Sequence, residues 1–126
     1  MTAMPFEYAV LRVVPRVDRG EFINGAVLLY CQQAGYLGMR VRPDLSCVQV
    51  LAADADLVAI RSALDSAALV AAGHAGGGEA ALADAGRRFR WLTAPRSAVI
   101  QPGPVHTGVT SDPPAELERI AARMLG

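Results

Sequence analysis

A run of apolar residues without polar alternation occupies positions 26–31, and this feature most constrains how the chain can fold. A strand with one face in water alternates between apolar and polar residues, whereas a strand covered on both faces does not. We therefore expect residues 24–32 to form a central strand that is buried on both sides. Asn24 and Gly25 begin this segment, and such a pair favours either a turn or a bulge where another backbone approaches closely.

Two neighbouring segments predict partners for the central strand. Residues 6–14 are rich in β-branched and aromatic residues, are largely apolar on both faces, and end at Pro15. Arg12 is the exception within them, either as an arginine that reaches solvent near the strand end or as a cation that points into a polar site. Residues 36–41 follow the central strand after a short turn, which predicts an antiparallel hairpin.

Two shorter segments are harder to assign. Residues 98–101 predict a fourth strand, and the prolines around them restrict it to the edge of the sheet. Residues 45–51 are ambiguous: Val48 and Val50 favour a short strand, and a helical turn is the alternative. The glycine-rich residues 72–78 predict a linker, because a helix precedes them and no phosphate-binding lysine follows.

Three helices are predicted from capping residues and apolar spacing. Asp54 is a suitable N-cap for a helix that continues to about residue 70, and a second helix spans residues 79–89 or slightly beyond. The last helix has Asp112 as its N-cap and Pro113 at its first helical position. Its apolar stripe, at helical spacing, consists of Leu117, Ile120, Ala121 and Met124.

These elements predict one α+β domain over residues 1–126, with an antiparallel sheet of about four strands and three helices packed on it. The hydrophobic fraction of 52% and the mean hydropathy of +0.28 support a real core. No apolar run is long enough to predict a membrane span, and the N-terminal residues do not resemble a signal peptide. A cytoplasmic location is the default expectation, and there Cys31 and Cys47 are expected to be reduced core thiols.

Charge and residue usage exclude several function classes. The net charge is zero, which provides no broad electrostatic surface for nucleic acid or anionic lipid. The chain contains no lysine, and this argues against the usual forms of Walker-type nucleotide-binding proteins, kinases and Schiff-base enzymes. Arginines at 87, 88 and 90 alternate with Phe89 and Trp91 in a pattern that superficially suggests nucleic-acid binding. We favour the alternative that they complement the dipole at a helix C-terminus.

Two polar clusters are candidates for a functional site. One surrounds Arg19, Glu21 and Asn24, and the other lies just before the last helix. If that helix packs beside the central strand, the clusters meet, and together they offer acid–base groups and an anion-binding surface. The residues assigned to this hypothesis are Glu21 and His106 as acid–base groups, and Arg12, Arg19, Asn24, Arg96, Thr107 and Thr110 as ligand contacts.

Several residues of the two clusters also have a purely structural explanation. Arg19 and Glu21 pair with each other in that interpretation, and Asn24 and Asp112 cap backbone groups. No metal site is predicted, because the chain has only two histidines without paired spacing. No cofactor is predicted either, and no Gly-x-Ser-x-Gly elbow indicates a hydrolase.

Several motifs resemble a bacterial family known as domain of unknown function 3037. The family begins with a Tyr-x-Val-x-Arg-x-x-Pro strand, which is found here at residues 8–15. It continues with an Arg-Gly-Glu-Phe-x-Asn segment, here residues 19–24, and an apolar strand. It ends with a threonine, then Asp-Pro and a leucine-bearing helix, matched by Thr110, Asp112, Pro113 and Leu117. The chain departs from the family at Gly25 and Ala26, where Val-Gly is more usual.

The resemblance implies a partner role, because members of this family are often encoded beside HipA-like kinases. We therefore expect a non-enzymatic accessory module that binds a HipA-like kinase or a second copy of itself. The alternative is a small enzyme or binding domain for an anionic, phosphorylated ligand held by the arginine, glutamate, asparagine and histidine side chains. Membrane association and nucleic-acid binding are not expected.

Overall fold

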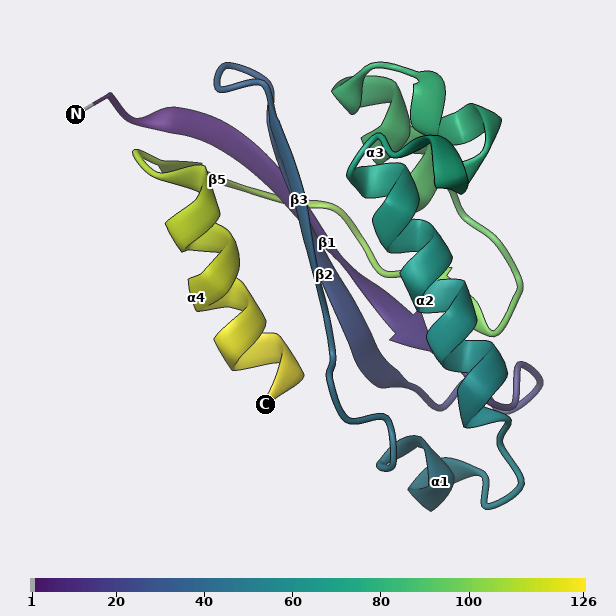
Figure 1. Cartoon of the computed structure of the whole chain (residues 1–126). Helices are drawn as coiled ribbons and strands as arrows, with labels where there is room; N and C mark the ends of the chain where they lie inside the picture. The colour runs from purple at the N-terminus through teal and green to yellow at the C-terminus, as the bar shows by residue number, and fades with distance from the viewer. Residues whose placement is uncertain (1) are drawn as a thin grey trace.

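The computed structural model describes residues 2–126 and has one antiparallel sheet, which is viewed close to edge-on in Figure 1. Its strands are β1 (Met4–Val13), β2 (Ile23–Cys31), β3 (Tyr36–Val41), β4 (Ile100–Pro102) and β5 (His106–Thr110). The order is β3-β2-β1-β4, and β5 pairs with β1 beside β4. The predicted α+β class is confirmed, as is the hairpin of β2 and β3.

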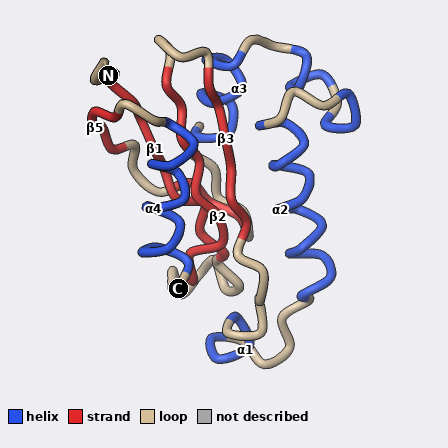
Figure 2. The backbone as a smooth tube through the Cα atoms, turned by 60° about the vertical axis from the view of Figure 1, so that its left-hand side comes forward, coloured by secondary structure: helices blue, strands red, loops and turns tan. Residues whose placement is uncertain are grey.

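Helices cover both faces of this sheet, as the run at positions 26–31 predicts. Helix α4 (Pro113–Leu125) lies on one face, and α2 (Leu57–Ala71) and α3 (Ala85–Thr93) lie on the other, so that the sheet is the middle of three layers (Figures 1 and 2). Successive residues of β2 alternate between the two cores: Leu28 packs with the α2 and α3 side, and Leu29 packs with the α4 side. Both are completely buried, which confirms that β2 is central.

Strand β1 divides in the same way and carries the side chains that matter for the site. Leu11 and Val13 belong to the core under α2 and α3, whereas Tyr8 and Val10 face the core under α4. The register between β1 and β2 shifts at Leu11/Arg12, where Gly25 is the extra residue of a bulge. A Cβ at Gly25 would lie 2.8 Å from Cγ2 of Val13, so this backbone approach requires glycine. Of the two alternatives predicted for Asn24 and Gly25, a turn or a bulge, the structure has the bulge.

The first long helix begins later than predicted. Its N-cap is Asp56, whose carboxylate accepts a hydrogen bond from the amide of Ala59, and not Asp54. The favoured strand within residues 45–51 was wrong, because Val48–Leu51 form the short helix α1. The spacing of the buried side chains gives the reason: Leu45, Val48 and Ala52 recur at helical intervals, and strand alternation is absent.

The second predicted helix is divided into separate turns. Short 3₁₀ turns at Ala75–Gly77 and Glu79–Leu82 precede α3, which begins after Asp84. The Asp84 carboxylate accepts a hydrogen bond from the amide of Arg87 at 2.9 Å, and this cap starts a new helix in place of a continuous one. The last helix agrees with prediction, since Asp112 caps it and Pro113 opens it.

Candidate functional site

A pocket of about 260 Å³ lies on the α4 side of the sheet, and we call it the Arg12 pocket. Strand β1, the start of β2, the β4–β5 connection and the end of α4 all contribute to its walls. Its principal side chains are Tyr8, Arg12, Phe22, Asn24, His106 and Met124, and Val10, Gly103 and Pro104 complete the lining. The pocket thus brings Arg12 and Asn24 together with His106, although Asn24 and His106 are 82 positions apart in the sequence.

Arg12 is held in this pocket by packing and has no ion-pair partner among the described residues. Its guanidinium carbon lies 4.2 Å from the centroid of the Phe22 ring, within the range of a cation–π contact. Its Nε is buried without a hydrogen-bond partner. A Cβ at Gly103 would lie only 3.1 Å from that nitrogen, so the glycine makes room for the guanidinium. A buried donor without a partner is costly, and the guanidinium that carries it lines the pocket, so this cation is available to an acceptor that binds there.

His106 enters the pocket because β5 pairs with β1. The register places His106 directly opposite Tyr8, and the two rings stack with their centroids 5.0 Å apart. Opposite residues of an antiparallel pair project to the same face, which explains the contact. The imidazole is exposed, whereas Tyr8 is partly buried. With Phe22, these rings give the pocket flat aromatic surfaces next to one cation.

Asn24 has a structural role in addition to its place in the pocket. Its side-chain amide donates a hydrogen bond to the carbonyl oxygen of Met124 at 3.1 Å, near the C-terminus of α4. Its own backbone oxygen accepts a bond of 2.7 Å from Nε of Arg42. The bond to Met124 anchors the last helix to the sheet, because it satisfies a helix carbonyl that has no partner in the next turn.

Other predicted site residues lie outside the Arg12 pocket. Glu21 and Arg19 form an exposed ion pair at 2.9 Å and do not line it. Thr110 is buried, and its hydroxyl oxygen accepts a hydrogen bond from the amide of Asp112, just before α4. Thr107 opposes Glu7 in the β1–β5 ladder, one residue out of phase with the Tyr8–His106 pair, so it projects to the other face.

Arg96 also lies elsewhere, near the end of α3. Its guanidinium carbon is 4.9 Å from the centroid of the Trp91 ring. Nη2 donates to the carbonyl oxygen of Trp91, and Nε donates to that of Ala94 at 3.3 Å. Arg96 lines a different cavity, between α2, α3 and β4. The predicted anion clamp of Arg12, Arg19 and Arg96 is therefore not assembled in one pocket.

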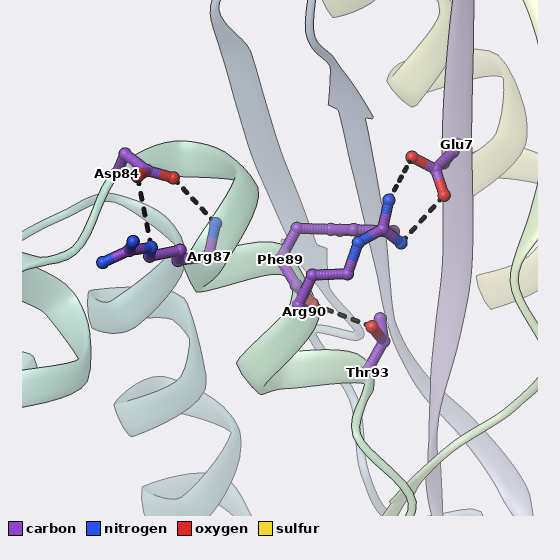
Figure 3. A network of polar contacts seen from close by, with 6 residues as sticks. All are labelled: Glu7, Asp84, Arg87, Phe89, Arg90 and Thr93. Atoms are coloured by element: carbon purple, nitrogen blue, oxygen red, sulfur yellow. Dashed lines mark hydrogen bonds and ion pairs between the residues drawn. The ribbon is translucent and has the colours of Figure 1, made fainter.

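Arg87 and Arg90 of the 87–91 segment form contacts within the protein (Figure 3). Arg90 makes two hydrogen bonds, of 2.7 and 2.9 Å, to the carboxylate of Glu7 on β1, and this hydrogen bonding raises the pKa of Arg90. Arg87 lies 3.7 Å from the carboxylate of Asp84. The sequence pattern predicts that Arg87, Arg88 and Arg90 lie near the C-terminus of a helix and complement its dipole. Only Arg90 lies in the last turn of α3, so the prediction was wrong for Arg87 and Arg88.

Residues 2–126 contain neither a cluster of metal ligands nor a helix that could cross a membrane. Within that range, no group of three or more His, Cys, Asp or Glu side chains is placed to hold a metal ion. Cys31 is buried and Cys47 is partly buried, and both are free thiols. In the same part of the chain, every helix is too short or too polar to cross a membrane.

Tyr8, Phe22 and Gly103 are pocket residues that were not predicted from the sequence. Phe22 lies within the Arg-Gly-Glu-Phe-x-Asn segment and is 43% exposed, so a large apolar side chain beside polar neighbours was the available signal. Tyr8 shares its strand face with Arg12, since the two are four residues apart. No local signal identifies Gly103, because the need for glycine arises from Arg12, which is far from it in the sequence and adjacent to it only in the fold.

Comparison with known proteins places this fold and pocket in a family. No curated protein and no solved structure matches the chain. A family described as "Protein of unknown function (DUF3037)" matches residues 8–125, which include all the side chains of the Arg12 pocket. Because this match extends over nearly the whole chain, the protein belongs to the DUF3037 family.

Proposed function

We propose that this protein is a non-enzymatic binding module whose Arg12 pocket receives an acidic group of a protein partner. One observation carries the proposal: the Arg12 guanidinium lines the pocket over the Phe22 ring, and its Nε has no hydrogen-bond partner. The described lining contains no aspartate, glutamate, serine or cysteine that would activate or be activated by His106. A cation next to aromatic rings is suited to binding an acidic group. Acid–base catalysis would require a second titratable group placed to work with the histidine.

A HipA-like kinase is the first candidate partner, as the family resemblance implies. Arginine, tyrosine and phenylalanine are common in the centres of protein interfaces, where arginine and tyrosine often provide much of the binding energy. The exposed Phe22 ring and the His106–Tyr8 stack provide such a surface around Arg12. An aspartate or glutamate of the partner would pair with the guanidinium in a charge-assisted hydrogen bond.

Co-purification with a HipA-like kinase encoded beside this protein tests the proposal. We expect the wild type to form a complex and Arg12→Gln to weaken it by at least tenfold, because a paired interface arginine contributes about 2 kcal/mol or more. Arg87→Gln is the matched control, since it removes an equal charge from exposed α3. Glu21→Ala is a second control, because Glu21 lies outside the pocket. A complex that tolerates Arg12→Gln would refute the assignment of the interface to this pocket.

A small anionic ligand is the second candidate occupant, favoured by the size of the pocket. A volume of about 260 Å³ is below the usual range for drug-sized ligands, and it suits a phosphate or carboxylate head group. In this case Arg12 contacts the anion and His106 lines the same pocket, whereas Glu21 is not a pocket group. Phosphate and phosphorylated metabolites should then raise the melting temperature of the wild type but not of Arg12→Gln. Equal shifts for both proteins would contradict a ligand site at Arg12.

A further inference from the structure

A second cavity, of about 390 Å³, lies on the opposite face of the sheet, and we call it the α2 cavity. It lies between α2, the end of α3 and strand β4. Short side chains create the space, because α2 contributes Ala63, Ser66 and Ala67 where a larger residue would reach β4. A smaller space of about 170 Å³ shares Ala63 and Val99 with it, so the hollow extends along the helix.

The lining of the α2 cavity is almost entirely apolar. Leu11, Val70, Leu92 and Ile100 contribute aliphatic surface, and the partly exposed Trp91 contributes an aromatic wall. Such a hollow is of the size and character that small-molecule sites have in proteins: mostly apolar, with a few polar groups that fix orientation. A groove for a partner helix would have to be considerably larger, because a helix with its side chains is about 10 Å across.

Arg96 is the one charged residue of this lining. Its guanidinium lies over the Trp91 ring and donates to carbonyl oxygens at the end of α3 through Nη2 and Nε. No carboxylate among the described residues pairs with it, and Nη1 makes no hydrogen bond there. A fixed cation beside an apolar cavity complements a ligand that has a negative head and an apolar body.

We propose that the α2 cavity binds a small aliphatic monocarboxylate. The carboxylate pairs with Arg96, and the hydrocarbon chain lies along the alanine face of α2 against Trp91 and Leu92. A fully polar ligand would lose its hydration against the aliphatic lining without gaining hydrogen bonds in return, and a cationic amphiphile would be repelled by Arg96. This site is separate from the Arg12 pocket, because Leu11 and Arg12 are adjacent on β1 and line the two cavities on opposite faces.

The experiment is a titration of the purified protein with octanoate. Trp91 is the only tryptophan, so its fluorescence reports on this cavity alone, and the melting temperature provides an independent readout. Octanol serves as the neutral analogue with the same chain. Ala63→Phe fills the cavity from an exposed helix position, and Ala122→Phe is the matched control on exposed α4.

We expect saturable octanoate binding to the wild type and to Ala122→Phe, and a loss of at least tenfold in affinity for Ala63→Phe. Arg96→Gln should weaken octanoate by about fivefold, the effect of one solvent-accessible ion pair, and leave octanol unchanged. The proposal is overturned if octanoate does not saturate, if Ala63→Phe binds normally, or if Arg96→Gln weakens both ligands equally. It is also overturned if size-exclusion chromatography shows a dimer that Ala63→Phe dissociates, because a second copy would then occupy the cavity.

Discussion

Replacing Gly25 by alanine is expected to lower the free energy of unfolding by about 1–2 kcal/mol, because the bulge in β2 has no room for a Cβ. The added atom would lie 2.8 Å from Cγ2 of Val13 and 3.3 Å from the carbonyl oxygen of Leu11. Val13 is completely buried and β-branched, so it cannot rotate away easily, and the Leu11 carbonyl belongs to the backbone of β1.

Two opposing effects set the magnitude for Gly25→Ala. Overpacking of a tight core costs about 1–3 kcal/mol. Alanine also restricts the unfolded chain, which stabilises by about 0.4–1 kcal/mol where the native backbone accepts it. Gly25 does not have a positive φ, so that gain is available here, unlike at Gly35 with φ of 60°. The steric cost exceeds this gain, because one of the two close neighbours, the Leu11 carbonyl oxygen, is a backbone atom that cannot move aside easily.

Urea denaturation followed by Trp91 fluorescence measures this effect, and a double-mutant cycle identifies its cause. Val13→Ala alone should cost about 2–3 kcal/mol through the lost methyl groups and the space they leave. In that background Gly25→Ala should cost at least about 1 kcal/mol less than in the wild type, since the clashing Cγ2 is absent. A neutral or stabilising Gly25→Ala, or additive effects of the two substitutions, would refute the steric explanation.

Three further predictions concern contacts that hold the layers together. A double-mutant cycle of Glu7→Gln and Arg90→Gln should give a coupling of about 0.5–1 kcal/mol in urea unfolding, because the pair is bidentate but its side chains are 28% and 58% exposed. Asp112→Ala should cost about 1 kcal/mol through the lost N-cap of α4, and Asp112→Asn should cost much less. Burial raises the pKa of Tyr36 above its ordinary value of 10.0. The stability that this shift contributes is present below pH 10.0 and is lost as the pH rises through the folded-state pKa. Tyr36→Phe should therefore lose less stability than the wild type on alkaline titration.

The elements predicted correctly are those whose signal is local. The unalternating run of β2 predicts layers on both faces, and the structure has α4 on one and α2 with α3 on the other. Asp112 and Pro113 open α4 as expected, because a cap and a proline act on their own turn. Strand β5 was not predicted, since its sequence His-Thr-Gly-Val-Thr is polar and mostly exposed. It is a strand only because β1 offers it a hydrogen-bonding edge.

The candidate site was predicted in part for the same reason. Arg12 was identified because a charge within an apolar strand is unusual, and Asn24 because it begins the central strand. Their meeting with His106 depends on the β1–β5 register, which no local pattern specifies. A shift of that register by one residue would move His106 to the face of the sheet that carries Glu7, away from Arg12.

Glycine links this register to the composition of the pocket. A Cβ at Gly108 would lie 2.7 Å from the Phe6 ring that opposes it, so this pairing requires glycine. Only one register aligns Gly108 with Phe6, and the same register aligns His106 with Tyr8 two residues away. The steric fit at Gly108 therefore specifies the position of the imidazole above Tyr8, although Gly108 itself does not line the pocket. The pocket of a strand pair can thus depend on a glycine outside it, because every residue of a ladder shares one register.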